Sequence, residues 1–233
     1  MKNRVTESII LAVGIVVAAL LVMRGVQSFT DRDRVVNVKG LAEMEVAADR
    51  VIWPLVYKEI GNDLLTLHGN IEEKNSAIVS FLKRRGITDE EITVAAPQIV
   101  DLQADRYSNQ DYHYRYNATS VITVSSDKVD LIRELISKQS ELLKQGVAIT
   151  GDDYRYSVSY KYTRLNDIKP EMIEQATKNA RAAAEKFASD SGSKVGKIRD
   201  ASQGQFSISD RDENTPHMKN VRVVTTINHY LKN

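Results

Sequence analysis

The sequence predicts an α+β fold in which three helices pack against antiparallel sheets, preceded by an N-terminal transmembrane helix. Two observations carry this prediction. Small and apolar residues recur at three- and four-residue spacing in residues 170–198, which places them on one side of a helix. Segments of alternating apolar and polar residues stand in pairs between the helical segments, as in hairpins. The predicted order is β-β-α-β-β-α-β-α-β-β.

The helix at residues 170–198 is predicted to organise the fold. Its buried stripe consists of Ile173, Ala176, Ala180, Ala183 or Ala184, and Phe187. Small side chains on this stripe let the helix lie close against a sheet. Pro170 suits the first turn, where its missing N–H removes no hydrogen bond. Gly192 and Gly196 are predicted to end the helix and turn the chain back.

An uninterrupted apolar run at residues 9–23 predicts contact with a membrane; Lys2 and Arg4 precede it and Arg24 follows it. As a helix the run covers roughly 22 Å, less than the ~30 Å hydrocarbon core, and snorkelling of Arg24 with local thinning of the bilayer accommodates the difference. Two alternatives stay open, namely a secretory signal cleaved near residues 26–28, which releases the protein into the periplasm, and a buried core helix.

An uncleaved anchor is the preferred interpretation, because Arg24 follows the run directly and no A-x-A triplet stands there. It divides the chain into a signal-anchor segment at residues 1–28, a linker at residues 29–34 and one α+β domain at residues 35–233. The numbers of positive charges on the two flanks are similar and do not set the orientation. Since short N-terminal anchors usually export the chain that comes after them, we expect a single-pass inner-membrane protein with its C-terminal domain in the periplasm.

The first half of the domain is predicted as two strands and a helix. Residues 35–46 form a strand or strand pair, and Asp49 and Arg50 mark a turn. Residues 51–60 form a second strand, which Pro54 places at an edge or a bulge. A helix follows at residues 64–85, after a cap at Gly61, Asn62 and Asp63 and before Gly86; its predicted stripe is Leu64, Leu67, Ile71, Ile78, Phe81 and Leu82.

The second half continues with strands at residues 92–102 and 112–124. Ser126 and Asp127 are a plausible N-cap for a helix that ends at Gly146, with Val129, Ile132, Leu135, Ile136, Leu142 and Leu143 as its apolar positions. A strand is predicted at residues 150–162. After the long helix, a strand near residues 198–208, a polar loop and a last strand at residues 221–231 complete the chain.

Tyrosines alternate along two of these predicted strands. Tyr112, Tyr114 and Tyr116 form one ladder, and Tyr154, Tyr156, Tyr160 and Tyr162 form the other. Cross-strand aromatic pairs stabilise a sheet by ~0.2–1 kcal/mol each, which is the structural interpretation. The alternative is an exposed aromatic face for a partner subunit, a small ligand or a glycan, and the second ladder is the candidate for it.

Composition excludes several classes of function. The formal net charge of +1, without a surplus of clustered Lys and Arg, argues against nucleic-acid binding. The absence of cysteine excludes disulfides, thiolate chemistry and Cys-based zinc sites. Histidines are scattered, with no metal-binding spacing; they are His68, His113, His217 and His229.

No catalytic constellation stands out, and we predict no catalytic residue, cofactor or metal. Asp152 and Asp153, like the acidic run at residues 210–213, lack EF-hand spacing and are interpreted as solvated loops. The chain has no G-x-S-x-G elbow, and its glycine-rich segment at residues 192–196 follows a helix instead of leading into one. A cluster of Asp152, Asp153 and His217 with perturbed pKa values would be the remaining indication of an enzyme.

Four stretches together resemble a known family. They are residues 36–42 with 46–49, residues 86–92, residues 116–118, and the alanines 176, 180, 184 and 188 followed by Gly192, Lys194 and Gly196. In order and spacing they are similar to the SIMPL-domain family of bacterial periplasmic and envelope proteins, which includes a periplasmic immunogen and an oxidative-stress defence protein. Leu41 with Ala42, and Ala48 in place of a proline before Asp49, depart from the pattern.

The resemblance implies an α+β fold, and self-association into rings or higher oligomers as in at least one member. It implies no agreed catalytic residues. We therefore predict a non-enzymatic, membrane-anchored envelope protein that forms a homo-oligomer and supports envelope integrity or stress tolerance. The alternative is a periplasmic module that binds a small ligand or glycan with a tyrosine-lined sheet face.

Overall fold

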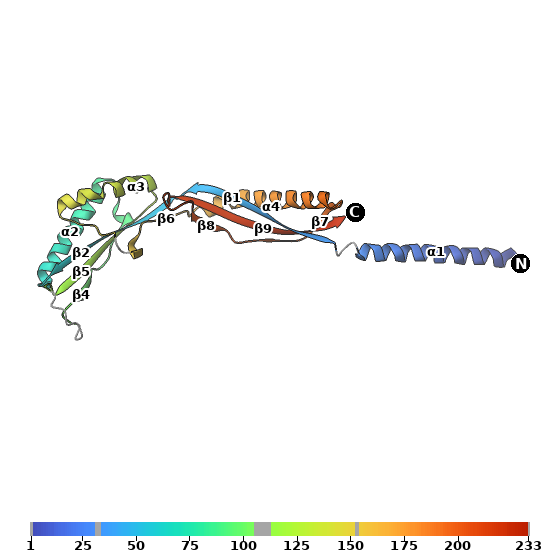
Figure 1. Ribbon diagram of the computed structural model, residues 1–233, viewed down its shortest axis with the longest axis horizontal. Helices are drawn as coiled ribbons and strands as arrows, with labels where there is room; N and C mark the ends of the chain where they lie inside the picture. Colours follow the sequence, from blue (N-terminus) through green and yellow to red (C-terminus); the bar gives the residue numbers. More distant parts are fainter. Residues whose placement is uncertain (1, 31–33, 105–112, 152–153, 233) are drawn as a thin grey trace. The chain divides into compact units, whose positions relative to one another are not determined.

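Figure 1 shows the computed structural model, which describes residues 2–30, 34–104, 113–151 and 154–232. The fold is α+β with antiparallel sheets, so the predicted fold class is confirmed. Contacts divide the chain into two compact units. The first contains Met1–Met44, Asn166–Ile208 and Val221–Asn233, and the second contains Glu45–Leu165 and Ser209–Asn220.

The N-terminal helix α1 (Lys2–Thr30) extends beyond the predicted apolar run at both ends. Its segment Ser8–Gly25 has a mean hydropathy of 2.4 and is 0% buried, so it is long and apolar enough to cross a membrane. At 18 residues this segment covers about 27 Å, closer to the thickness of a bilayer core than the predicted run of fifteen.

The first unit contains a sheet in the order β1-β9-β7, with one helix against it. Its elements are β1 (Val35–Ala47), α4 (Leu165–Asp190), β7 (Lys194–Gln203) and β9 (Met218–Lys232), and the short β8 (Ser207–Asp210) also pairs with β9. The core of this unit contains Val36 and Val38 of β1, Ala180 and Ala184 of α4, and Ile227 of β9.

Helix α4 confirms the predicted small-residue face and corrects its limits. The buried residues are Met172, Ala176, Ala180, Ala184 and Ala188. Phe187 was predicted to lie on this face but is 55% exposed, because the alanines recur at a strict four-residue spacing that leaves Phe187 on the flank. The helix begins at Leu165, so Pro170 lies inside it, and it ends at Asp190 before Gly192, whose φ is +66°.

The second unit contains a five-stranded sheet covered by helices. The strands are β2 (Arg50–Gly61), β3 (Ile92–Val94), β4 (Gln98–Asp101), β5 (Tyr116–Ser126) and β6 (Ser159–Lys161), in the order β3-β5-β2-β6, with β4 also paired to β5. The helices are α2 (Leu64–Arg84), α3 (Val129–Ser137) and the 3₁₀ segments η2 (Asp89–Glu91), η3 (Gln139–Gln145) and η4 (Tyr154–Tyr156).

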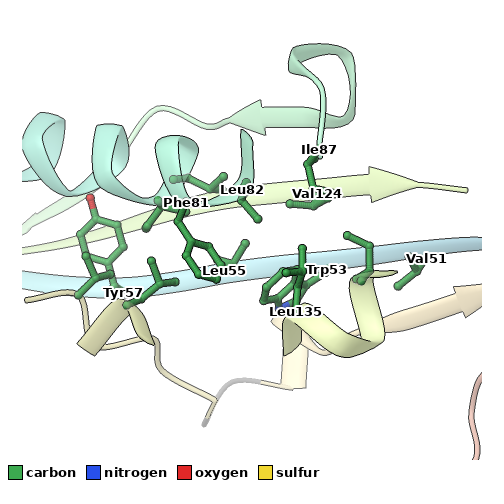
Figure 2. Packing of buried hydrophobic residues seen from close by; sticks show 14 residues of the cluster. Val51, Trp53, Leu55, Tyr57, Phe81, Leu82, Ile87, Val124 and Leu135 are labelled. Atoms are coloured by element: carbon green, nitrogen blue, oxygen red, sulfur yellow. The ribbon is translucent and has the colours of Figure 1, made fainter. Parts of the chain in front are cut away.

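The core of the second unit lies between β2 and the helices α2 and α3, as Figure 2 shows. Trp53, Leu55 and Tyr57 alternate along β2 and point toward Phe81 of α2 and Leu135 of α3. All five side chains are at most 2% exposed. The alternation of β2 and the three- and four-residue spacing of α2 therefore meet on one face of the sheet.

Helix α2 confirms its predicted caps. Asp63 accepts a hydrogen bond from the backbone N–H of Thr66 at 2.8 Å, and Gly86 follows the helix with a φ of +89°. The predicted stripe is buried from Leu67 onward, whereas Leu64 is 44% exposed because it lies in the first turn.

Pro54 lies inside a paired strand without interrupting it. The carbonyl of Val56 points away from β5, because it accepts a hydrogen bond from the backbone N–H of Thr150 at 2.7 Å. Residues two apart in a strand point their backbone groups to the same side, so the nitrogen of Pro54 also points away from β5. The ladder between β2 and β6 covers only Arg50, Val51 and Ile52. The missing N–H of Pro54 therefore removes no ladder bond, although β2 is not an edge strand of its sheet.

The structure divides two elements that were predicted to be continuous. The strand predicted at residues 92–102 is divided into β3 and β4. Val94 pairs with Ile122 of β5 and Gln98 pairs with Thr119, so a step of four residues on one strand lies opposite a step of three on the other. The extra residue forms a bulge beside Pro97. The helix predicted to end at Gly146 becomes α3 and η3.

The structure differs most from the prediction in the tyrosine-rich segments. The predicted strand at residues 150–162 is wrong, because Tyr154 and Tyr156 lie in η4 and, of the residues described in this range, only Ser159–Lys161 pairs as a strand. In the other ladder only Tyr116 lies in a strand, Tyr114 precedes β5, and Tyr112 lies outside the described residues. Alternation also arises where a chain crosses a surface without pairing, so it indicates a strand only when a partner strand is present.

Candidate functional site

A cleft of about 500 Å³ in the second unit brings two of the four candidate tyrosines together. Its floor is a row across three strands, since Thr119 of β5 is paired with Lys58 of β2 on one side and with Gln98 of β4 on the other. These residues lie on the face opposite the core, because their neighbours Tyr57 and Ala118 are buried against α2.

Thr150 and the 3₁₀ segment η4 form the wall of the cleft. Thr150 is bonded to the sheet, because its backbone N–H donates to the carbonyl of Val56 at 2.7 Å. Tyr154 is 88% exposed, whereas Tyr156 is half-buried beside Arg155, whose guanidinium carbon lies 5.7 Å from the ring centroid. The cleft therefore presents two phenol rings over a polar floor.

The other two candidate tyrosines do not line this cleft. Tyr160 lies in β6 and packs against the hydrophobic core, and burial raises the pKa of its phenol. Its ring lies edge-on to His217, with 6.1 Å between the ring centroids. Tyr162 follows β6 and is half-buried. Tyr160 therefore acts as a packing residue, and of the four candidate tyrosines Tyr154 and Tyr156 line the cleft.

The chemistry of the cleft is suited to binding. Its described lining supplies hydroxyl groups, one amide and the cations Lys58 and Arg155. Aromatic rings with a polar edge, next to amide and hydroxyl groups, suit a small polar ligand such as a sugar. Asp152 and Asp153 precede Tyr154 in the sequence and lie outside the described residues.

Asp210 and Asp212, in the acidic run at residues 210–213, make internal contacts. Asp212 accepts hydrogen bonds from the backbone N–H groups of Asn214 and Thr215, at 2.9 and 2.8 Å. The side chains of Thr215 and Arg211 add further bonds, and together these lower the pKa of Asp212 to about 2. Asp210 is paired with Lys219. This loop therefore matches the interpretation as a surface loop.

In the part of the chain that the structure describes, no group of three metal-ligating side chains occurs. Nδ1 of His68 lies 3.7 Å from Oε2 of Glu72 on the exposed face of α2. Burial and the nearby positive charges of Arg133 and Arg211 lower the pKa of His217. His229 is 4% exposed in the first unit.

Sequence reasoning missed Lys58, Gln98 and Thr119. These residues come from three strands and meet only through the register of the sheet. No local pattern marks them, because a register is set by pairing between residues far apart in the chain.

Comparison with known proteins identifies the family. No curated protein matches the chain. A family model described as SIMPL, protein of unknown function (DUF541), matches residues 36–226. The match covers most of the chain and includes α2, α3, α4 and the cleft described above, whereas α1 lies outside it. The chain therefore belongs to the SIMPL family, as its motifs predicted.

Proposed function

We propose that this protein is a non-enzymatic, membrane-anchored protein of the cell envelope. In this proposal the SIMPL region lies in the periplasm, self-associates, and supports envelope integrity or stress tolerance. The observation that carries the proposal is α1, whose apolar segment Ser8–Gly25 is exposed over its whole length. Exposure of this many apolar side chains to water is unfavourable by about 25 cal/mol per Å², so a membrane is their natural environment.

The anchored form is favoured over a cleaved signal by the path of the helix. α1 continues through residues 26–28, the predicted cleavage position, to Thr30. A peptide bond inside a regular helix is a poor protease substrate, because its backbone groups are occupied by helical hydrogen bonds.

Fractionation of cells that express the intact chain tests the anchor. We expect the protein in the membrane fraction after alkaline extraction, with the mass of the uncleaved chain. Leu20→Arg places a charge inside the span and is expected to reduce membrane retention. Lys39→Gln in β1 is the control and leaves retention unchanged. A soluble protein shortened by the first 28 residues would contradict the anchor.

The self-association proposal is supported by the β3–β4 edge, which we define as residues 92–101. Both strands pair with β5 and form one edge of the sheet. Val94, Ile99 and Val100 are 47%, 44% and 56% exposed on it. Apolar edge strands offer unpaired backbone groups and favour pairing with another chain. The second copy of this chain is the proposed partner.

Light scattering of the intact protein in detergent, with the detergent mass subtracted, tests this interface. We expect the wild type to be oligomeric at tens of micromolar and Ile99→Lys to shift it toward the monomer. Leu65→Lys in α2 is the control, because Leu65 is 84% exposed and lies outside the edge. A monomeric wild type, or an equal effect of the two variants, would contradict the proposal.

A second candidate function is ligand binding in the cleft of Tyr154 and Tyr156. The favouring observation is the arrangement of two phenol rings over the polar row of Lys58, Thr119 and Gln98. Short oligosaccharides with a uronic acid are suitable probes, since their rings stack on tyrosine and their carboxylate faces Lys58.

Calorimetric titration with such an oligosaccharide tests the cleft. We expect Tyr156→Ala to abolish binding without unfolding the protein, and Tyr114→Ala, which is outside the cleft, to leave it unchanged. Tyr160→Ala is expected to lower stability instead, because Tyr160 packs against the core. Equal binding by wild type and Tyr156→Ala would rule out this site.

A further inference from the structure

The first unit contains a second concave feature, a groove of about 770 Å³ between one flank of α4 and the strand β7. We call it the α4–β7 groove and define it by Arg181 of α4, Lys194, Lys197 and Ile198 at β7, and Ile227 and His229 of β9. None of these residues belongs to the tyrosine cleft.

The groove exists because α4 covers only part of its sheet. The alanine face of α4 packs with β1 and with Ile227 of β9. β7 lies at the far side of β9 in the order β1-β9-β7, and Ile198 on it is 53% exposed. Ile198 is paired with His229, so the two side chains lie on the same face of the sheet.

His229 is the polar group on which the inference rests. His229 is one of the residues that line the groove, and it is 4% exposed. Neither Nδ1 nor Nε2 has a hydrogen-bond partner among the described residues. Buried polar groups in proteins are nearly always bonded, and an unbonded one costs about 1–3 kcal/mol. A bound group that accepts a hydrogen bond from the N–H of the ring would remove part of this cost.

The charges around the groove select the sign of the ligand. Its described lining includes the cations Arg181, Lys194 and Lys197 against one acid, Glu185. Glu185 is already bonded to Nε of Arg181 at 2.9 Å. Within the described ranges Lys194 and Lys197 make no ion pair, so the groove carries an unneutralised positive charge that favours an anion.

The length and surface of the groove select the shape of the ligand. Its α4 side extends from Thr177 to Ser189, about 18 Å along the helix axis, and Ile198 and Ile227 make part of its surface apolar. An added β-strand is disfavoured, because Lys194, Lys197 and two register irregularities make β7 a poor pairing edge. A single acyl chain fits both length and surface.

We propose that the α4–β7 groove binds a single-chain anionic amphiphile, a carboxylate or phosphate monoester on an acyl chain. The chain lies along α4 over Ile198 and Ile227, the anionic group is neutralised by Lys194 and Lys197, and the His229 imidazole donates a hydrogen bond to an oxygen of the ligand.

The test uses the intact protein in nanodiscs of uncharged phosphatidylcholine, with the histidine rings ¹³C-labelled for NMR. Dodecanoate, dodecyl phosphate and dodecanol are titrated separately. We expect a saturable shift of the His229 resonance with one or both anions and none with dodecanol, while His68, His113 and His217 serve as internal references. The anion that saturates at lower concentration identifies the headgroup. No saturable shift with either anion, or an equal shift with dodecanol, would overturn the proposal.

Three substitutions, one of them a control, complete the test. Lys197→Glu is expected to weaken binding roughly tenfold or more, the equivalent of about 1.4 kcal/mol, whereas Lys39→Glu, an exposed lysine on β1 outside the groove, leaves it unchanged. His229→Phe is expected to weaken binding of the anion, measured by ligand-induced change in melting temperature, and to raise the melting temperature of the free protein because an unbonded polar group is removed. An equal effect of the two lysine substitutions contradicts the site even where His229→Phe does not fold.

Discussion

Gly40 of β1 lies directly against the backbone of α4 at Ala176. A Cβ atom built on Gly40 would stand 1.9 Å from the carbonyl oxygen of Ala176 and 2.4 Å from the amide nitrogen of Ala180. Helix and strand can approach this closely because neither has a side chain larger than a methyl group at the contact. The side-chain amide of Asn179 reinforces it by donating to the carbonyl of Leu41 at 2.7 Å.

Gly40→Ala is therefore expected to destabilise the protein severely. The added methyl overlaps backbone atoms, which cannot move as a flexible side chain can, so α4 must shift from β1. We expect a loss of about 3 kcal/mol or more in the free energy of unfolding, measured by urea denaturation. Gly69→Ala is the control, because a Cβ on Gly69 in α2 meets nothing within 4 Å; it is expected to stabilise by about 0.5–1 kcal/mol.

Glu91 is the centre of a hydrogen-bond network that makes stability depend on pH. Its carboxylate accepts from Ser126 Oγ at 2.5 Å, from the backbone N–H of Thr88 at 2.8 Å and from Lys128 Nζ at 2.9 Å. Burial by itself raises the pKa of Glu91, but these bonds outweigh it and lower the pKa from 4.5 to about 2. The network therefore stabilises the fold above pH 4.5, and this stabilisation is lost as the pH falls toward 2.

Glu91→Gln is expected to lower the free energy of unfolding by about 1–3 kcal/mol at neutral pH. The variant should also lose less stability than the wild type as the pH falls below 4.5. The measurement is the urea midpoint as a function of pH. Glu90→Gln is the control, since Glu90 is an exposed neighbour in the same 3₁₀ segment. If Glu91→Gln kept the full acid dependence of the wild type, the network would not be its source.

Asp49 caps the segment that leads into α4. Its carboxylate accepts from the backbone N–H of Thr163 at 2.8 Å and of Arg164 at 3.1 Å, and Thr163 Oγ1 adds a bond at 3.0 Å. Burial opposes the shift, but these bonds and the charge of Arg164 lower the pKa of Asp49. Asp49→Ala is expected to lower the free energy of unfolding, measured by chemical denaturation, by about 1–2 kcal/mol. Asp127→Ala, an exposed acid nearby in the fold, should change stability little.

The alanine before Asp49, which departs from the family pattern, has a role in this turn. The backbone N–H of Ala48 donates to the carbonyl of His217 at 2.8 Å. Proline has no N–H, so Ala48→Pro is expected to leave that carbonyl without its partner and to cost about 1–3 kcal/mol in the free energy of unfolding. Thermal denaturation of Ala48→Pro beside Ala48→Ser, which keeps the N–H, would show it; equal melting temperatures would contradict this role.

Tyr57 places a hydroxyl group in the core of the second unit, toward α2 (Figure 2). The hydroxyl oxygen lies 2.9 Å from the carbonyl oxygen of Ile71 and 2.9 Å from Oδ1 of Asn75. Tyr57→Phe keeps the ring but leaves these acceptors without that donor, and we expect a loss of about 1–2 kcal/mol in urea denaturation. Tyr114→Phe, at an exposed tyrosine, is the control. Similar losses of unfolding free energy in the two variants would contradict a stabilising role for the buried hydrogen bond of Tyr57.

Local features were predictable because they depend on neighbours in the chain. The four-residue spacing of Ala176, Ala180 and Ala184 predicted the buried face of α4, and the structure confirms it. The same holds for Gly86 at the end of α2, whose φ of +89° suits glycine.

Features that depend on pairing were not predictable in this way. Alternation of tyrosines at residues 154–162 indicated a strand, but a strand forms only where a partner supplies hydrogen bonds, and β6 pairs over three residues. The cleft floor likewise depends on the register that places Lys58 and Gln98 on either side of Thr119.

The sequence by itself thus determined the apolar N-terminal helix, the family, the fold class and the small-residue face of α4, since each follows from composition or spacing within a short window. Only the tertiary structure decided that Gly40 lies against the backbone of α4, that η4 replaces a strand, and that the His229 ring is buried with no hydrogen-bond partner for its nitrogens among the described residues. The physical reason is that strand register and helix–sheet contact join residues far apart in the chain, and the free energy of those contacts outweighs local preference.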